Sequence, residues 1–299
     1  MDLRNCTKQE LSQMPYEYVC EAYYQHNPNA VWILGVFFRH GKNGAPQNYE
    51  KARQLLEIAY EYEGAGSGFI LGNIYEEGLG TTVDLKKAED YYCAFSEETH
   101  DPTGYSAAAF LYLKNENLPN RDEKIPEYLK KSEALGGCPL SDTLIGQLYI
   151  AGTPDFPKDI NKAVFYLERS KNYKILGDLF SDEKNIEPNY KLASYYYELG
   201  MSDNMDCCAK YAFLNLYYGS INESWTNVPK GISVAKKYLK TNNNYESSFF
   251  ILKAMFLFFD KAKNIEGLEL CTDYLYIIGE CNSDCLLYTS PSPRDRQKS

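Results

Sequence analysis

Histidine is scarce in this sequence, and the cysteine patterns that often accompany it at metal sites are missing. The 299 residues include three histidines, His26, His40 and His100, and no two of the nine cysteines form a C-x-x-C pair. A structural zinc site needs cysteine or histidine ligands clustered at short spacing. The sequence therefore predicts neither a metal site nor a bound cofactor.

Positive charge is also low. The chain has 31 lysines and arginines against 41 acidic residues, a net charge of -10, and no basic stripe runs along it. Binding to nucleic acid depends largely on neutralising phosphates with lysine and arginine. The composition therefore argues against a nucleic-acid partner.

A long hydrophobic run is absent as well. The most apolar stretch, FFILKAMFLFF at 249–259, has eleven residues and is interrupted by Lys253, whereas a membrane-spanning helix needs about 20 apolar residues. We expect a buried helix there and no membrane contact in this chain. The first residues lack a basic region followed by an apolar run, so no signal peptide is predicted and we expect a cytoplasmic protein.

The last fifteen residues, CLLYTSPSPRDRQKS at 285–299, differ abruptly in composition from the chain before them. One choice of codons for this segment resembles the transposon-end adaptor that is joined to fragments for high-throughput sequencing. We interpret 285–299 as adaptor translated in frame, so that the chain is a fragment without its native C-terminus. A genuine tail rich in proline and serine is the alternative.

What the sequence does contain is an internal repeat. A glycine is followed by any residue, an aliphatic residue, an aromatic residue, two further residues and a second glycine. The copies start at 35, 72, 109 and 146, a constant step of 37 residues, and a shortened copy starts at 177; the copy at 109 has lost its glycines. The glycines of the pattern are Gly35 and Gly41, Gly72 and Gly78, Gly146 and Gly152, and Gly177.

A second element follows four of these copies. An alanine comes four residues after an asparagine or aspartate, and a large apolar or aromatic residue comes three residues after the alanine. The pairs are Asn48 with Ala52, Asp84 with Ala88, Asp159 with Ala163, and Asn189 with Ala193. This spacing predicts a helix whose first amides are capped by the asparagine or aspartate side chain.

Each repeat is therefore predicted to form two antiparallel helices. The first glycine and the alanine are small enough for the two helices to approach closely, and the second glycine ends the first helix where φ > 0 is favoured. A phosphate-binding loop would instead need a strand before the glycines. We predict an all-α fold, a right-handed α-solenoid of about five to seven stacked helix pairs with no β-sheet.

These motifs resemble the Sel-one-like repeat, a relative of the tetratricopeptide repeat. GFILGNIYEEGLGTTVDLKKAEDYY at 68–92 and TLIGQLYIAGTPDFPKDINKAVFYL at 143–167 match it most fully. The resemblance covers residues 29–200. We expect an N-terminal helical cap at 1–28 and degenerate or divergent helical repeats at 201–284.

The resemblance implies a non-catalytic scaffold or adaptor that binds a protein or peptide on a concave face lined by the first helix of each unit. The side chains expected to contact that partner directly follow the first glycine and recur three residues later. They are Val36 and Arg39, Asn73 and Glu76, and Gln147 and Ile150.

Two alternatives stay open. The chain could be a membrane-tethered subunit of a protein quality-control or secretion complex, with its anchor beyond the end of this sequence. It could also be a hydrolase with a hidden site, because Ser181 and Lys184 fit S-x-x-K, 202–204 read S-D-N, and 240–242 begin like K-T-G but lack the glycine. In serine β-lactamases these motifs lie on a buried helix and a strand, whereas 181–185 is predicted as a loop. The hydrolase is therefore the weaker alternative, and we expect no enzymatic activity.

Overall fold

The computed structural model describes residues 2–221, 223–241 and 245–280, and these ranges consist of helices joined by loops. Sixteen α-helices and one short 3-10 helix form, and no strand occurs among the described residues. The predicted all-α fold without a sheet is thereby confirmed for this part of the chain. The segment 285–299, on which the adaptor interpretation rests, lies outside the described residues.

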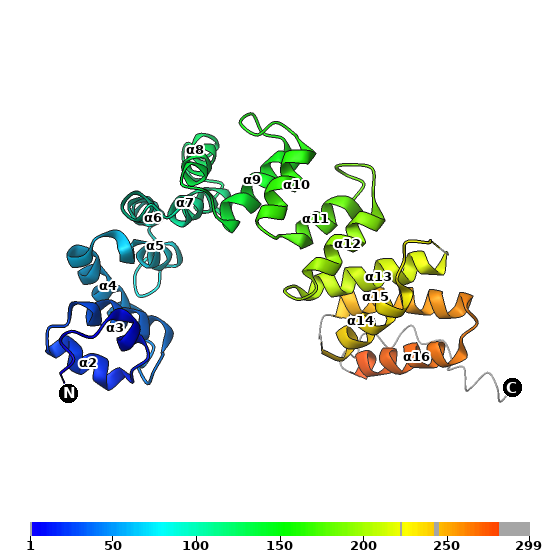
Figure 1. The fold of residues 1–299 in the computed structure, drawn as a ribbon, viewed down its shortest axis with the longest axis horizontal. Coiled ribbons are helices and arrows are strands. Elements are labelled where there is room, and N and C mark those ends of the chain that lie inside the picture. Colours follow the sequence, from blue (N-terminus) through cyan, green and yellow to red (C-terminus); the bar gives the residue numbers. More distant parts are fainter. Residues whose placement is uncertain (1, 222, 242–244, 281–299) are drawn as a thin grey trace. The chain divides into compact units, whose positions relative to one another are not determined.

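The helices follow one another with short connections (Figure 1). In chain order they are α1 (Lys8–Ser12), α2 (Tyr16–Tyr24), α3 (Pro28–His40), α4 (Tyr49–Glu63), η1 (Ala65–Ser67), α5 (Gly68–Glu77), α6 (Leu85–Thr99), α7 (Thr103–Lys114), α8 (Arg121–Ala134), α9 (Pro139–Ala151), α10 (Ile160–Arg169), α11 (Tyr173–Ser181), α12 (Tyr190–Gly200), α13 (Met205–Ser220), α14 (Val228–Thr241), α15 (Tyr245–Lys261) and α16 (Ile265–Glu280).

Consecutive helices pack in pairs, as the repeat predicts. Extensive contacts join α3 to α4, α5 to α6, α7 to α8, α11 to α12, α13 to α14, and α15 to α16. Neighbouring pairs also touch, since α6 packs against α7 and α12 against α13. The copy that starts at 109 forms the pair α7–α8 even though its two glycines are absent.

The chain divides into two compact units, the first from Met1 to Tyr166 and the second from Leu167 onward. Each unit contains more than one hydrophobic cluster. One cluster of the first unit is centred on α6, α7 and α8, and a separate one is formed by α1, α2 and α3. Successive small clusters in place of one large core are typical of repeat proteins, in which each pair buries its apolar face against its neighbours.

In four repeats the second helix begins at the predicted side-chain cap. The side chains of Asn48, Asp84, Asp159 and Asn189 each accept a hydrogen bond from the backbone N–H three residues further on, at 2.9–3.0 Å. Such a cap satisfies one of the amides that the first turn leaves without an intrahelical partner. The capping predicted from sequence is confirmed at all four positions.

The second glycine lies where the first helix of a repeat ends. Gly41, Gly78 and Gly152 follow α3, α5 and α9 with φ of 63°, 69° and 76°. This left-handed region is strained for residues that carry a Cβ atom, so glycine lets the chain leave the helix at low cost.

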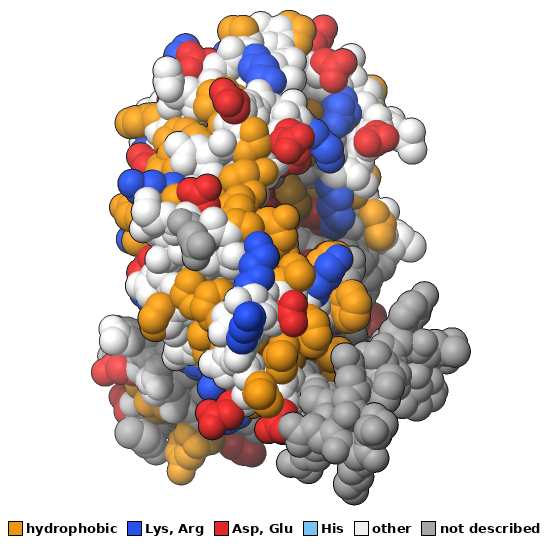
Figure 2. All heavy atoms as spheres, turned by 90° about the vertical axis from the view of Figure 1, so that its right-hand side faces the viewer, with side chains coloured by type: hydrophobic (Ala, Val, Ile, Leu, Met, Phe, Trp, Pro, Cys, Tyr) orange, Lys and Arg blue, Asp and Glu red, His pale blue; other side chains and the backbone are white. Residues whose placement is uncertain are grey.

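The expectation of a wholly buried helix at 249–259 is wrong for one of its faces. In α15, Ile251 and Met255 are buried, whereas Phe249 and Phe256 are 54% and 46% exposed. The reason is that α15 packs against α13 and α16 on one side, and no described helix covers the other. The space-filling view in Figure 2 shows hydrophobic side chains gathered among charged ones on the molecular surface.

Candidate interaction surfaces

The side chains predicted to contact a partner lie on α3, α5 and α9, two on each helix. Because they occupy equivalent positions of the repeat, each pair recurs at the same place on its own helix. Gln147 is exposed, and the other five are half-buried: Val36, Arg39, Asn73, Glu76 and Ile150.

The two residues on α5 are held by other groups of the first unit. The Asn73 side-chain amide donates to the carbonyl oxygen of Phe69 at 2.8 Å. The carboxylate of Glu76 accepts a hydrogen bond from the Tyr92 hydroxyl at 2.8 Å and is paired with Lys114 at 3.2 Å. Glu76 therefore links α5 to α6 and α7, and its side chain is only 12% exposed.

The first glycine of a repeat lies opposite a large side chain of the second helix. A methyl group built on this glycine would lie 2.3 to 2.7 Å from the facing side chain, which is closer than van der Waals contact allows. The facing residue comes four positions after the repeat alanine, one helical turn further on. The pairs are Gly35 with Leu56, Gly72 with Tyr92, and Gly177 with Tyr197.

The remaining positions of the repeat signature are buried. Gly146 is buried within α9. The four alanines of the second helices, Ala52, Ala88, Ala163 and Ala193, have no exposed surface. The sequence predicts that glycine and alanine together let the two helices approach closely. In the structure the space beside the glycine is taken by Leu56 or by a tyrosine ring of the second helix.

A lysine three residues after the cap lies over the aromatic ring of the first helix in the same repeat. The ammonium-to-centroid distances are 5.5 Å for Lys51 over Phe38, 4.8 Å for Lys87 over Tyr75 and 5.2 Å for Lys162 over Tyr149. This geometry suits a cation–π contact. The lysine that directly precedes the repeat alanine therefore has a structural role that the spacing of the motif does not predict.

Hydrogen bonds from tyrosine to glutamate connect the helix pairs to one another. In each case a carboxylate on the second helix of one pair accepts a hydrogen bond from a tyrosine hydroxyl of the next pair. The pairs are Glu57 with Tyr75, Glu89 with both Tyr112 and Tyr128, Glu133 with Tyr166, and Glu168 with Tyr196. Tyrosine hydroxyls therefore reach carboxylates across the boundary between one helix pair and the next.

A sequence signal for these connections exists but is weak. In the first and fourth copies the accepting glutamate comes five residues after the repeat alanine, at Glu57 and Glu168. In the second copy it comes one residue after the alanine, at Glu89. Because the offset changes, the pairing becomes visible only when the helices are placed side by side.

Glu89 is the most enclosed of these carboxylates, with a side chain that is 5% exposed. Burial alone would raise its pKa, but hydrogen bonds from Tyr128, Lys86 and Tyr112 more than offset burial and lower the pKa of Glu89. Burial and the bond to this carboxylate raise the pKa of Tyr112 to about 12. The group is therefore a satisfied, ionised structural carboxylate.

A comparable cluster surrounds Asp178 in the second unit. Its carboxylate accepts a hydrogen bond from the Tyr197 hydroxyl at 2.7 Å and is paired with Lys174 at 3.1 Å and with Lys210. Burial would raise the pKa of Asp178, but the contacts with Lys210 and Tyr197 outweigh burial and lower it. These contacts tie α11 to α12 and α13.

The residues that fit the hydrolase motifs do not lie on the buried helix and the strand that a serine β-lactamase uses. The loop predicted at 181–185 begins one residue later, because Ser181 is the last residue of α11. Its hydroxyl contacts the Asp178 carbonyl oxygen and the Tyr197 hydroxyl. Lys184 pairs with Asp182 at 3.9 Å instead. Lys240 lies in α14, a helix and not a strand, and position 242 lies outside the described residues.

No set of three histidine, cysteine, aspartate or glutamate side chains is arranged to hold a metal ion within the described ranges. Within the same ranges, no helix combines the length and the hydrophobicity needed to cross a membrane.

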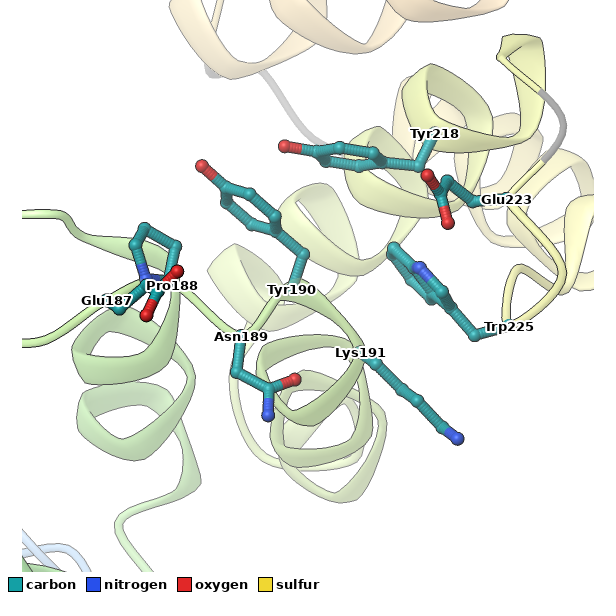
Figure 3. Close-up of a pocket in the computed structure, with 8 residues that line it drawn as sticks. All are labelled: Glu187, Pro188, Asn189, Tyr190, Lys191, Tyr218, Glu223 and Trp225. Atoms are coloured by element: carbon teal, nitrogen blue, oxygen red, sulfur yellow. The ribbon is translucent and has the colours of Figure 1, made fainter.

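The second unit has a surface hollow that the sequence did not reveal. We call it the aromatic hollow; its volume is about 410 Å³, and Figure 3 shows the side chains around it. It lies between the start of α12 and the end of α13 with the following loop. The lining residues are Glu187, Pro188, Asn189, Tyr190, Lys191, Tyr218, Glu223 and Trp225.

Four segments match the family model of the Sel1 repeat: residues 28–61, 69–100, 140–172 and 176–201. The chain contains Sel1 repeats. The four matched segments hold the motif copies at 35, 72, 146 and 177. The copy at 109 is unmatched, in keeping with its lost glycines, although it folds as a helix pair like the Sel1 repeats around it.

Solved structures of Sel1 repeat proteins share the fold. A protective antigen present in uropathogenic Escherichia coli strains, which displays an SLR fold, aligns with a TM-score of 0.63 and 14% identity over 88% of this chain and 58% of its own. A Sel1 repeat protein from Oxalobacter formigenes aligns with a TM-score of 0.59 and 17% identity over 79% of this chain and 100% of its own. At these identities the likeness concerns the fold alone, and this chain spans 58% of the length of the antigen. A comparison with curated proteins gives no match.

Proposed function

We propose that this chain is a non-catalytic scaffold that binds a protein or peptide along the first-helix side of its Sel1 repeats, across α3, α5 and α9. The observation that carries the proposal is the recurrence of partly exposed side chains at equivalent positions of three repeats. A partner that follows several repeats in turn is the kind of ligand that such an extended, repeated face suits.

The rigidity of these side chains supports the proposal. Asn73 is held by the carbonyl oxygen of Phe69, and Glu76 is held by Tyr92 and Lys114. A side chain that is already ordered loses little conformational entropy when a partner docks on it. The face therefore combines a fixed polar centre on α5 with exposed or half-exposed groups on α3 and α9.

The chemistry of the six positions favours a mixed polar and apolar partner. Val36 and Ile150 offer apolar surface, Arg39 and Glu76 offer opposite charges, and Asn73 and Gln147 offer amide groups. Such a mixture is typical of protein–protein contacts. Localisation in the cytoplasm and the membrane-tethered alternative remain predictions from the sequence.

The test is capture of partners from an extract of the source cells, followed by a binding measurement with the identified partner. We expect Asn73→Ala combined with Glu76→Ala to weaken binding at least about tenfold, or ~1.4 kcal/mol. Gln147→Ala with Ile150→Ala should weaken it as well, because the same partner would cover α9.

A matched control separates loss of contact from loss of stability. Tyr92→Phe removes one hydrogen bond to Glu76 but leaves Glu76 paired with Lys114, so it should lower stability while partner affinity falls less than about threefold. If both double variants bind like the unmodified protein, the first-helix side is not the binding face.

A further inference from the structure

We infer that the aromatic hollow of the second unit binds an arginine side chain presented by a segment of a partner protein. This site is separate from the face proposed above and uses none of its residues. The inference rests on three features of the hollow: stacked aromatic rings, carboxylates that form no ion pair with a described residue, and a volume that fits one side chain with its flanking backbone.

The aromatic wall is already assembled. The rings of Tyr190 and Tyr218 stack with centroids 4.6 Å apart, and those of Tyr218 and Trp225 lie 5.5 Å apart at an angle of 43°. All three residues are half-buried, so part of each ring remains accessible. Figure 3 shows the Tyr218 ring next to the rings of Tyr190 and Trp225. A planar cation can stack on such a wall without reorganising it.

The charge beside the rings is negative. Glu187 and Glu223 line the hollow and are exposed, and neither forms an ion pair with any residue that the structure describes. Glu183 lies close enough that its negative charge, after burial and the Tyr190 hydrogen bond, helps to raise the pKa of Tyr218. Two carboxylates therefore line the hollow beside the rings.

One cation is present among the lining residues. Figure 3 shows the ammonium group of Lys191 pointing away from Tyr190 and Tyr218. Its charge opposes a cationic ligand only in part, because the carboxylates outnumber it. Removing the Lys191 charge should therefore strengthen the binding of a cationic ligand, and this change can be tested.

Among ligand groups, guanidinium fits these features best. It is planar, stacks on aromatic faces, and forms two parallel hydrogen bonds to one carboxylate. Phosphate and carboxylate groups would be repelled by the glutamates, and an ammonium group is a hydrated point charge that gains less from stacking. A volume of about 410 Å³ lies within the range of ligand pockets and exceeds what a guanidinium group alone would fill.

The two tryptophans of the chain allow a direct measurement. Trp225 borders the hollow, whereas Trp32 packs against a hydrophobic cluster of the first unit. We would titrate the full chain, labelled with nitrogen-15, with the peptide acetyl-Gly-Ser-Arg-Ser-Gly-amide and follow both indole N–H signals. Only the Trp225 signal should shift, with a Kd of about 1 mM.

Variant peptides define the ligand chemistry. The lysine peptide should bind at least about threefold more weakly, and the neutral citrulline peptide should not bind. Equal affinity for the arginine and lysine peptides, binding of the citrulline peptide, or the absence of a Trp225 shift at about 10 mM peptide overturns the inference. Acetyl-arginine-amide that binds as tightly as the peptide overturns the assignment to a protein segment.

Variants of the protein test which charged residues of the hollow contribute to binding. Glu187→Gln with Glu223→Gln should weaken arginine-peptide binding at least about fivefold, and Lys191→Gln should strengthen it about twofold. All three positions are exposed, so these changes should leave the helical fold intact, which circular dichroism would check. Unchanged affinity in the double glutamine variant contradicts the site.

Discussion

At the scale of the residue, a helix-interior glycine and the ring that faces it define how a Sel1 repeat of this chain packs. Gly72 lies in the middle of α5, a position where alanine would ordinarily stabilise a helix by about 0.5–1 kcal/mol. Here the space that a Cβ atom would take is occupied by the ring of Tyr92, which is 1% exposed. Steric overlap therefore outweighs helix propensity.

We expect Gly72→Ala to destabilise the protein by about 1–3 kcal/mol, because the new methyl group would lie 2.4 Å from the Tyr92 ring. Thermal or denaturant unfolding followed by circular dichroism measures this effect. Gly66→Ala is the matched control, since a Cβ atom there meets nothing within 4 Å. A Gly72→Ala variant as stable as the control would show that the ring does not set the spacing of α5 and α6.

At the scale of the element, carboxylates connect one helix pair to the next. Glu89 on α6 accepts hydrogen bonds from Tyr112 on α7 and Tyr128 on α8, and it is paired with Lys86 at 3.0 Å. Lys124 on α8 lies 3.8 Å from the same carboxylate. A buried carboxylate with this many partners stabilises the fold only while it is ionised.

This arrangement predicts a pH dependence of stability at acid pH. The folded-state pKa of Glu89 lies below its ordinary value of 4.5, so the folded protein binds fewer protons than the unfolded chain in that range. The stabilisation is complete above pH 4.5 and is lost as the pH falls through the folded-state pKa.

We expect Glu89→Gln to cost about 1–3 kcal/mol near pH 7, and this difference from the unmodified protein should shrink as the pH falls below about 4.5. Urea unfolding of both proteins between pH 7 and pH 3 measures the difference directly. Other carboxylates titrate in both proteins and cancel in the comparison. A difference that stays constant across this range would mean that the Glu89 charge contributes nothing to the fold.

At the scale of the whole molecule, the separate hydrophobic clusters indicate that stability is distributed along the chain. Met255 lies in a cluster formed by α13, α14, α15 and α16 and has no exposed surface. The cluster of α6, α7 and α8 belongs to the other unit. In a repeat array, a local defect acts chiefly on the nearest neighbours.

We expect Met255→Ala to lower local stability by about 2–5 kcal/mol through the cavity that it leaves. Amide hydrogen exchange should accelerate in α13 to α16 and change little in α5 to α8. Phe256→Ala is the control, because that side chain is 46% exposed and its loss should cost less than about 0.5 kcal/mol. Equal acceleration across both units would show that the chain unfolds as one cooperative body.

Local features of the sequence determined the helices. Caps such as Asp84 and helix ends such as Gly78 depend on backbone conformation within a few residues, so their spacing is readable without a structure. The step of 37 residues identified the repeat unit even where the copy at 109 had lost its glycines. The positions of the expected contact residues on first helices follow from that step.

Only the tertiary structure decided how exposed and how engaged those residues are. The pairing of Glu76 with Tyr92 and Lys114 and the stacking of Tyr190 on Tyr218 join residues that are distant in the sequence. The exposed face of α15 depends on which helices pack against it. The physical reason is that a side chain acquires its partners from neighbouring helices, and the repeat fixes which helices are neighbours but not which of their side chains meet.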